Sequence, residues 1–273
     1  ARARSFHGRA YAPSIAGRVW SLSRDREGCR RVQHALEVAD VDTKISLSAE
    51  LRGHVWEAMR CPHANHVLQR CVTSLPPEAS QFVIDEIRRH GRGAVVQAAK
   101  HRFGCRIIER LLESCQESQL DPVVSDLVEE LVLLASHPYG NYVVQHLLEH
   151  GPPGAKRRLV EHLGRCLPEI RYDGYTGVVV AKALACGEKD TRLELAKRIL
   201  AVPGMLRTVL RTRHGHAATK LILQLFEDSP IERIAVCSIL ECEAAAAREH
   251  RSGTFEPSEC DMPAQQSERG SGL

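Results

Sequence analysis

The chain has 273 residues, of which 43% are hydrophobic and 4% are aromatic, and its formal net charge is +3. This composition suffices for a continuous core of Leu, Ile, Val and Ala, and the small net charge is weak evidence for a nucleic-acid partner. Because no stretch approaches the about eighteen consecutive apolar residues of a membrane span, we expect no membrane partner.

The N-terminal segment has two interpretations. Residues 1–24 contain five arginines and no acidic residue, which is typical of a mitochondrial transit peptide. We favour the alternative, in which residues 1–23 are an N-terminal cap or the remnant of an upstream repeat, with a helix at 12–23.

Polar turns divide the rest of the chain into helix pairs. First helices are predicted at 12–23, 46–59, 79–98, 122–135, 154–167 and 190–210, and second helices at 28–39, 64–74, 104–115, 140–150, 176–186 and 215–227. Gly91 and Gly93 should break the long helix at 79–98. Residues 228–250 should form a C-terminal capping helix, since a terminal repeat needs a polar outer face. Residues 251–273 have few apolar side chains and are expected to be disordered.

One short pattern returns in every second helix. It occupies 28–33, 64–69, 104–109, 140–145, 176–181 and 215–220, and its second residues lie 36 to 40 residues apart. A period in this range is typical of helical repeats. We therefore expect an all-α protein, a right-handed α-helical solenoid of about six two-helix repeats that covers 24–227.

Positions in each second helix are counted from that second residue, which is position zero. Positions +2, +3, +6 and +7 are apolar in repeats three and four, and they predict a buried stripe. Positions zero and +4 lie one turn apart on another face and are polar in repeats one to four: Cys29/Gln33, Asn65/Gln69, Cys105/Glu109 and Asn141/Gln145. Position +5 is basic in repeats one to five, where it is His34, Arg70, Arg110, His146 and Lys182. These five side chains and Lys220 of repeat six are candidate phosphate contacts.

These segments resemble the RNA-contacting helices of the Pumilio-type (PUF) family, most closely at 103–110 and 139–151. The resemblance implies single-stranded RNA along the concave side of a helical arc, with one base at each repeat. It assigns base-edge contacts to positions zero and +4, and stacking to position +1, which is Arg30, His66, Arg106 and Tyr142. It further implies a monomeric, cytoplasmic regulator of mRNA 3′UTR elements after transcription, acting with protein co-regulators.

The chemistry of the pairs indicates which base each repeat prefers. Glu109 only accepts hydrogen bonds, and guanine alone presents two adjacent donors on its pairing edge, so Cys105/Glu109 suits guanine. The Asn/Gln pairs suit uracil, and Cys29/Gln33 suits adenine. Since RNA runs antiparallel to the protein in the PUF family, repeats four to one would bind 5′-UGUA-3′. We expect both Cys105 and Glu109 to face solvent.

The last two repeats depart from this pattern. Repeat five has Gly177, Val178 and Ala181, which offer neither a base-edge hydrogen bond nor a stacking plane. Repeat six has His216, Ala217 and Lys220, which fit no base. Two alternatives therefore stay open: a protein-interaction scaffold of the HEAT or armadillo type, and a nucleolar PUF-like protein that binds structured RNA without sequence recognition.

Two further signals are weighed against the repeat. Residues 146–150, His-Leu-Leu-Glu-His, match a metalloprotease motif. However, Glu149 lies at +8, as Glu37 and Glu113 do, and His146 lies in the basic +5 column, so we expect no metal, no cofactor and no enzyme activity. Ten cysteines without a CxxC pair favour reduced thiols in an intracellular protein.

Overall fold

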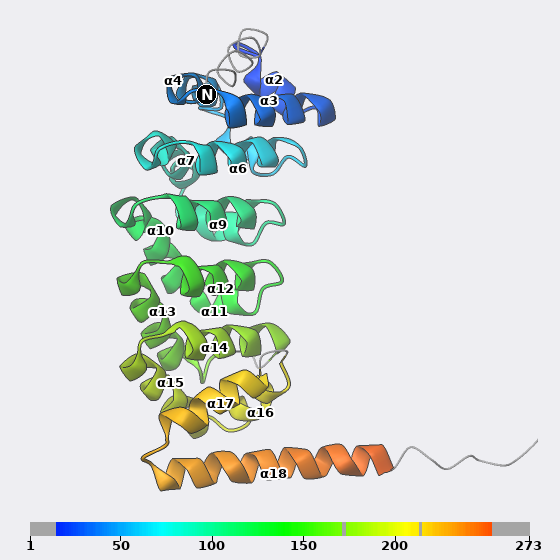
Figure 1. Ribbon diagram of the computed structural model, residues 1–273, viewed down its shortest axis with the longest axis vertical. Coiled ribbons are helices and arrows are strands. Elements are labelled where there is room, and N and C mark those ends of the chain that lie inside the picture. The colour runs from blue at the N-terminus through cyan, green and yellow to red at the C-terminus, as the bar shows by residue number, and fades with distance from the viewer. Residues whose placement is uncertain (1–14, 171–172, 213–214, 253–273) are drawn as a thin grey trace, which may run out of the picture.

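The computed structural model describes residues 15–170, 173–212 and 215–252, which form one elongated stack of helices (Figure 1). Within these residues the structure contains seventeen helices and no strand. The all-α solenoid predicted from the sequence is confirmed. None of the described helices is both long and apolar enough to cross a membrane. The predictions for residues 1–14 and 253–273 lie outside the described residues.

Repeats two, three, four and six each contain three helices. A long outer helix is followed by a short helix and then by the helix that carries the repeated pattern. Repeat two contains α4 (Val41–Ala49), α5 (Val55–Ala58) and α6 (Ala64–Ser74), and repeat three contains α7 (Pro77–Arg89), α8 (Ala94–Ala99) and α9 (Gly104–Ser114). Repeat four contains α10 (Glu117–Glu129), α11 (Leu131–Ala135) and α12 (Gly140–His150), and repeat six contains α15 (Lys189–Ala201), α16 (Met205–Leu210) and α17 (Gly215–Leu225).

The first and fifth repeats show fewer helices within the described residues. Repeat one has α2 (Val19–Ser23) and α3 (Arg26–Val38), and repeat five has α13 (Pro153–Cys166) and α14 (Gly174–Cys186). The last helix, α18 (Pro230–Ser252), packs against α15 and α16 at the C-terminal end of the stack (Figure 1).

The predicted first helices differ from the observed ones in extent. Those at 46–59, 79–98, 122–135 and 190–210 are each divided into a long and a short helix. The breaks at Gly53 and Gly93 have φ of +83° and +80°, a left-handed conformation that glycine adopts readily. The prediction that Gly91 and Gly93 interrupt their helix is confirmed. The helix predicted at 12–23 falls partly outside the described residues, and the part from residue 15 on is helical at Val19–Ser23.

The helix predicted at 122–135 begins earlier than expected. In the structure Pro122 lies inside α10, which begins at Glu117 after a capping box formed by Gln116 and Gln119. The capping residues therefore determine where this helix starts.

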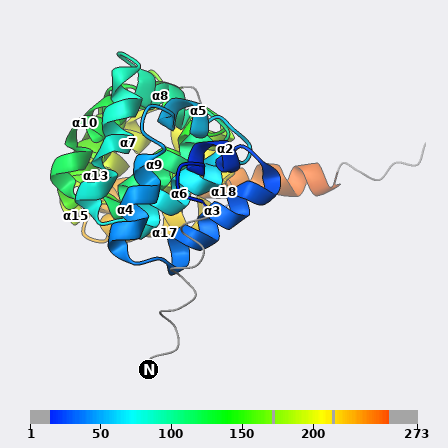
Figure 2. The ribbon, with the colours of Figure 1, turned by 90° about the horizontal axis from the view of Figure 1, so that it is seen from above.

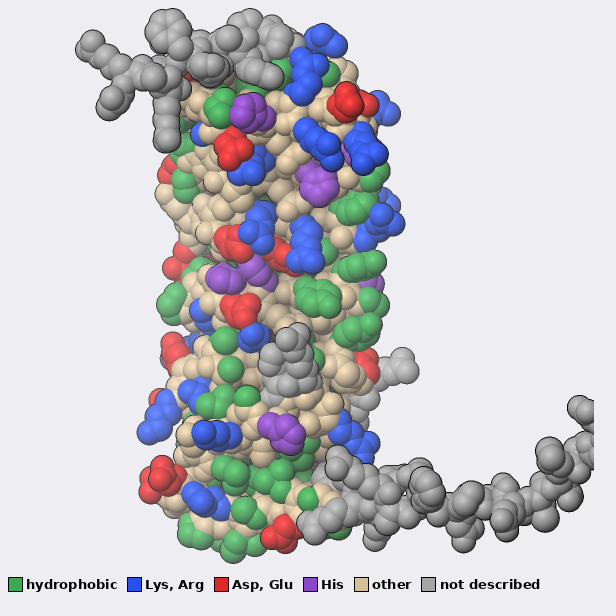
Figure 3. Space-filling view, turned by 45° about the vertical axis from the view of Figure 1, so that its right-hand side comes forward, with side chains coloured by type: hydrophobic (Ala, Val, Ile, Leu, Met, Phe, Trp, Pro, Cys, Tyr) green, Lys and Arg blue, Asp and Glu red, His purple; other side chains and the backbone are tan. Residues whose placement is uncertain are grey.

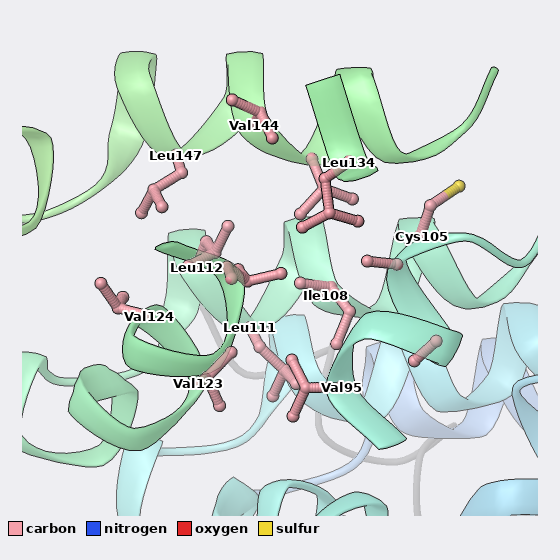
Figure 4. Close-up of a cluster of buried hydrophobic side chains, with 14 of the residues drawn as sticks. Val95, Cys105, Ile108, Leu111, Leu112, Val123, Val124, Leu134, Val144 and Leu147 are labelled. Atoms are coloured by element: carbon pink, nitrogen blue, oxygen red, sulfur yellow. The ribbon is translucent and has the colours of Figure 1, made fainter. Parts of the chain in front are cut away.

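The apolar stripe of the pattern helices forms the centre of the stack. The residues at +2, +3, +6 and +7 of repeat four, which are Val143, Val144, Leu147 and Leu148, are at most 1% exposed. Figure 4 shows Val144 and Leu147 facing Ile108, Leu111 and Leu112 of the preceding repeat. Burying such a side chain contributes about 1.5–3 kcal/mol, so each pattern helix is fixed against its neighbours mainly by this stripe.

Neighbouring repeats are also joined by polar contacts away from this stripe. The Glu50 carboxylate accepts from the N–H groups of Gly17 and Val19 in the repeat before it, at 2.7 and 2.8 Å. Glu86 does the same one repeat later, accepting from Gly53 and Val55 at 2.8 and 3.3 Å. Each carboxylate therefore satisfies the free N–H groups at the start of a short helix and fixes the register of two repeats.

Candidate nucleic-acid interface

The pattern helices form one continuous face of the stack, here called the column face. Helices α3, α6, α9, α12, α14 and α17 pack against one another in this order (Figures 1 and 2). Figure 3 shows this face from the side, with Lys, Arg and His side chains gathered over its N-terminal half. The column face is thus a periodic surface that presents an equivalent set of positions once per repeat.

Glycine at position −1 lets the pattern helices of repeats one and three begin close to the short helix before them. A Cβ atom added to Gly28 would lie 2.4 Å from the backbone oxygen of Leu22. At Gly104 the equivalent distance, to the oxygen of Ala98, is 2.6 Å. Both distances are shorter than any real Cβ contact, so the pattern helix could not approach as closely with a larger residue.

The side chains at position zero are buried. The exposed fractions are 5% for Cys29, 1% for Asn65, 2% for Cys105 and 2% for Asn141, whereas the glutamines at +4 are half-buried. Glu109 at +4 is 2% exposed, so the prediction that Cys105 and Glu109 face solvent is wrong. The reason is that consecutive pattern helices pack side by side and cover the residues that lie between them.

The two Asn/Gln pairs have the same hydrogen-bond geometry. Asn65 Nδ2 donates to the backbone oxygen of Cys61 at 2.7 Å, and Gln69 Nε2 donates to Asn65 Oδ1 at 3.0 Å. In repeat four Asn141 Nδ2 donates to His137 O at 2.7 Å, and Gln145 Nε2 donates to Asn141 Oδ1 at 2.8 Å. The asparagine thus anchors the glutamine, which keeps an acceptor oxygen and a second N–H for a ligand.

Repeat three contains an incompletely bonded carboxylate. Glu109 Oε2 accepts from Arg106 Nη1 at 2.8 Å, and this bond raises the pKa of Arg106. Glu109 Oε1 is buried and has no hydrogen-bond partner among the described residues. A buried acceptor without a partner is costly, and its free energy falls when a ligand supplies a donor.

The +1 side chains predicted to stack are exposed. Arg30 and His66 lie at the surface. The side chain of Arg106 is 55% exposed, and Tyr142 as a whole residue is 51% exposed. A hollow of about 420 Å³ lies beside His66 and is lined by His66, Gln33, Gln69, Arg70, Thr73 and Arg110. The +4 glutamines of repeats one and two and two of the predicted phosphate-binding arginines therefore line the same hollow.

The basic +5 residues of repeats three, four and five contact glutamates at +8. Glu113 contacts Arg110 of its own repeat, and its Oε1 lies 2.8 Å from His146 Nε2 in the next repeat. Glu149 contacts Lys182 one repeat further on, which lowers the pKa of the Glu149 carboxyl. A phosphate would have to compete with these acids. Arg70, in contrast, has no ion-pair partner among the described residues.

The residues of the metalloprotease motif at 146–150 contact different partners. Glu149, its proposed acid, contacts Lys182, and the nearer acid to His146 comes from the preceding repeat. Glu113, His146 and His150 have ligand atoms within 4.8 Å of one another. However, Glu113 already contacts Arg110 of its own helix and Glu149 contacts Lys182 of the next repeat, so ion pairs account for both acids without a metal.

Two histidines cap the pattern helices of repeats three and four. His101 Nδ1 accepts from the N–H groups of Phe103 and Gly104, each at 3.2 Å. His137 Nδ1 accepts from Tyr139 and Gly140 at 3.1 and 3.2 Å. Burial lowers the pKa of both histidines, and nearby positive charges, Arg60 and Arg102 for His101 and Lys100 for His137, act the same way.

These lowered pKa values define a pH dependence. Only the neutral ring has a free Nδ1 acceptor, so protonation removes the cap. Between the folded pKa and the unfolded value of about 6.5, the unfolded chain binds more protons than the folded chain. The stabilisation is therefore complete above about pH 6.5 and is lost as the pH falls from that value through the lower folded pKa.

Repeat five presents an aromatic residue that the sequence analysis missed. A second hollow, of about 470 Å³, is lined by Asn141, Tyr142 and Gln145 of repeat four and by Asp173, Gly174, Tyr175 and Val178 of repeat five. Tyr175 is 42% exposed. It lies at position −2, outside the expected contact positions, as Phe103 and Tyr139 do in repeats three and four.

In repeat six, His216 and Lys220 are exposed, and no hydrogen bond joins them as Asn and Gln are joined in repeats two and four. The cysteines of the described residues are all free thiols. Burial raises the pKa of Cys71 to about 12, so this thiol is held in its neutral form at physiological pH.

Fold and surface together define a class of protein, the helical-repeat solenoid that presents one set of polar side chains per repeat. The model of the Pumilio-family RNA binding repeat matches residues 18–52, 54–88, 94–128 and 130–163, which contain the patterns of repeats one to four. Because these matches cover half of the sequence, the chain belongs to the Pumilio family.

Relatives and solved structures agree with this assignment. Pumilio homolog 12 of Arabidopsis thaliana is 26% identical over 209 residues, which are 76% of this chain and 34% of that protein. The chain thus spans about a third of the length of this relative. The crystal structure of PUF-8 in complex with PBE-RNA superposes with a TM-score of 0.74 at 23% identity, covering 89% of this chain and 71% of that one. The Puf3 RNA binding domain bound to a Cox17 RNA 3′ UTR site gives a TM-score of 0.72 at 20% identity, covering 92% and 73%.

Proposed function

We propose that the chain binds single-stranded RNA along its column face and prefers the sequence 5′-UGUA-3′. Repeats four, three, two and one each meet one base, in that order from the 5′ end. Membership of the Pumilio family and the RNA complexes of the superposable structures support RNA as the ligand.

The observation that carries the sequence preference is the state of Glu109. Its Oε2 is held by Arg106, and its buried Oε1 lacks a donor. Guanine presents N1–H and N2–H₂ next to each other on its pairing edge and can supply that donor, whereas adenine and uracil each have a single donor group on this edge, directly beside an acceptor. Repeat three therefore favours guanine and disfavours the other bases.

The amide pairs of repeats two and four support uracil at the flanking positions. Gln69 and Gln145 each keep one acceptor and one donor after bonding their asparagine. Uracil offers the complementary N3–H donor next to a carbonyl acceptor. The identical geometry in two repeats supports the same base at both positions.

The proposal extends to the cellular role. The chain acts as a monomer on mRNA 3′UTR elements in the cytoplasm and regulates them after transcription through recruited protein co-regulators. Support comes from the family and from the 3′ UTR recognition site in the Puf3 complex.

A binding assay tests the proposal. Fluorescence anisotropy at one stated salt concentration should show tighter binding to RNA with UGUA than to the same RNA with UAUA. A good base contact contributes about 1–3 kcal/mol of discrimination, which is roughly 5- to 150-fold in Kd. Equal affinity for the two RNAs would exclude sequence recognition by repeat three.

A further inference from the structure

We propose that the short helices of repeats one to three carry a second RNA-binding surface, which holds the phosphate backbone of single-stranded RNA without recognising its bases. This surface, here called the basic edge, consists of Arg24, Arg60, Lys100 and Arg102. It lies on the side of the stack where α2, α5 and α8 are found (Figure 2). The inference goes beyond the proposed function and rests on it only for the class of ligand.

Three of these cations recur with the period of the repeated pattern. Arg24, Arg60 and Lys100 each occupy position −5 and are 36 and 40 residues apart. The two arginines are exposed and Lys100 is half-buried. Each cation stands at the C-terminal end of a short helix, since Arg24 and Lys100 are the C-cap residues of α2 and α8, and Arg60 follows the C-cap of α5. This period favours a polymer with regularly spaced negative charges, such as RNA, over an acidic protein.

The two arginines of this column are held on aromatic rings. The guanidinium carbon of Arg24 lies 5.6 Å from the centroid of the Trp20 ring, and that of Arg60 lies 5.7 Å from the Trp56 ring. Each tryptophan ring stacks in turn on a histidine of the following repeat, with centroids 4.5 and 4.4 Å apart. A guanidinium that lies over a ring keeps the N–H groups at its edge available for a bidentate bond to phosphate. The same arrangement in two consecutive repeats therefore provides phosphate donors with a fixed orientation.

The charges of the basic edge are not neutralised within the part of the chain that the structure describes. Its four cations form no ion pair there, whereas Arg157 and Arg198 of the C-terminal repeats are paired with glutamates. Burial lowers the pKa of His101, and the positive charges of Arg60 and Arg102 act the same way, so a positive potential is present at the start of α9. A polyanion bound to such a surface releases its counterions, which favours binding.

A hollow between the short helices gives the backbone room. It has a volume of about 510 Å³ and is lined by Arg60 of repeat two, by Lys100 of repeat three and by apolar side chains that include Trp56. Phosphates can meet the cations while the sugars contact the apolar wall. The hollow ends at repeat four, where Glu130 lines it and position −5 is Ser136. The basic edge is therefore confined to repeats one to three.

Anisotropy with labelled polycytidine measures binding to the basic edge when an unlabelled short UGUA RNA saturates the column face. The parent should bind polycytidine, and each phosphate contact should contribute about 0.7 to the slope of log Kd against log salt concentration. Replacing Arg24, Arg60 and Lys100 together with alanine should therefore lower this slope by about 2. A fourfold rise in salt should weaken the parent about 20-fold more than this triple variant.

The matched control removes three cations from the outer helices by Arg157→Ala, Lys197→Ala and Arg198→Ala. The control should keep the parent's salt slope, and both triple variants should bind the short UGUA RNA as the parent does. Equal losses in the two variants would mean that net charge alone attracts the RNA, and the proposal would be wrong. Tighter binding of polyglutamate than of polycytidine with the same number of charges would assign the surface to a protein partner instead.

Photocrosslinking of the unmodified protein gives a test that does not depend on the folding of a variant. With the column face saturated, polycytidine that carries 4-thiouridine should crosslink to the peptides containing Arg60 or Lys100. Absence of binding under these conditions, or crosslinks confined to the pattern helices, contradicts the proposal. A parent that fails to distinguish UGUA from UAUA contradicts the proposed function. A parent that distinguishes them, with no change of salt slope in the basic-edge variant, contradicts only the basic edge.

Discussion

Repeat three can be converted from a guanine site to a uracil site by Cys105→Asn together with Glu109→Gln. The structure contains the contacts that the new pair needs. Asn141 Nδ2 donates to His137 O, the same oxygen that accepts from the Asn141 backbone N–H at 3.1 Å. The equivalent oxygen in repeat three is His101 O, which accepts from the Cys105 N–H at 3.0 Å. The new asparagine can therefore bond His101 O and orient the glutamine.

The effects of the double substitution on stability and on RNA preference follow from the contacts that it removes and adds. The parent holds a buried carboxylate with one oxygen unpaired, and the variant replaces it with a neutral amide bonded to its neighbour. The loss of the Arg106 contact is thereby offset, and the free energy of unfolding should change by no more than about 1 kcal/mol. The parent should prefer UGUA over UUUA by about 1–3 kcal/mol, and the variant should prefer UUUA by a similar amount.

Competition anisotropy with UGUA and UUUA RNAs measures this reversal, and a thermal melt establishes that the variant is folded. The matched control is Cys29→Asn, which makes the same change at position zero of repeat one, where Gln33 is already present. It should alter the preference at the fourth base from adenine to uracil and leave the guanine preference intact. A folded double variant that still prefers UGUA would refute the assignment of one base to each repeat.

Three further predictions concern stacking, pH and packing. Tyr142→Ala should weaken binding to every RNA by about 1–3 kcal/mol without changing the preferred sequence, as measured by anisotropy with UGUA and UAUA. The melting temperature should fall as the pH is lowered from about 7.5 to about 5.5, and His137→Asn should make this dependence shallower, because the asparagine oxygen accepts a hydrogen bond and does not titrate. Gly177→Ala should lower the melting temperature, because its Cβ would lie 2.4 Å from Thr212 Cγ2 and 3.2 Å from Thr208 O, whereas Gly174→Ala, with no atom within 4 Å, should be milder.

The sequence alone was sufficient to predict the position and length of the pattern helices. The predicted helices at 64–74 and 140–150 coincide with α6 and α12, because an apolar stripe with a helical period extends along their whole length. The short helices were not predicted as separate elements. A helix such as α5, which has four residues, is too short to show a period, and only the left-handed Gly53 before it marks the break.

The residue types of the site could be predicted from the sequence, but the burial of its side chains could not. The spacing of four between positions zero and +4 correctly indicated that the two side chains meet, as they do in Asn65/Gln69 and Asn141/Gln145. Burial of position zero depends on how closely the next helix packs, and no local pattern encodes that distance. Tyr175 was missed because it lies at position −2, and only positions zero, +1, +4 and +5 were considered as contact positions.

The column face therefore combines a fixed frame with exchangeable contact residues. The frame consists of the buried stripe, the glycines at −1 and the glutamates that join repeats through the short helices. None of these includes positions zero, +1 or +4, so those residues differ between repeats one to four while the helices keep the same geometry. Repeat five differs because its frame has closed over position zero, where the packing of α16 leaves room only for Gly177.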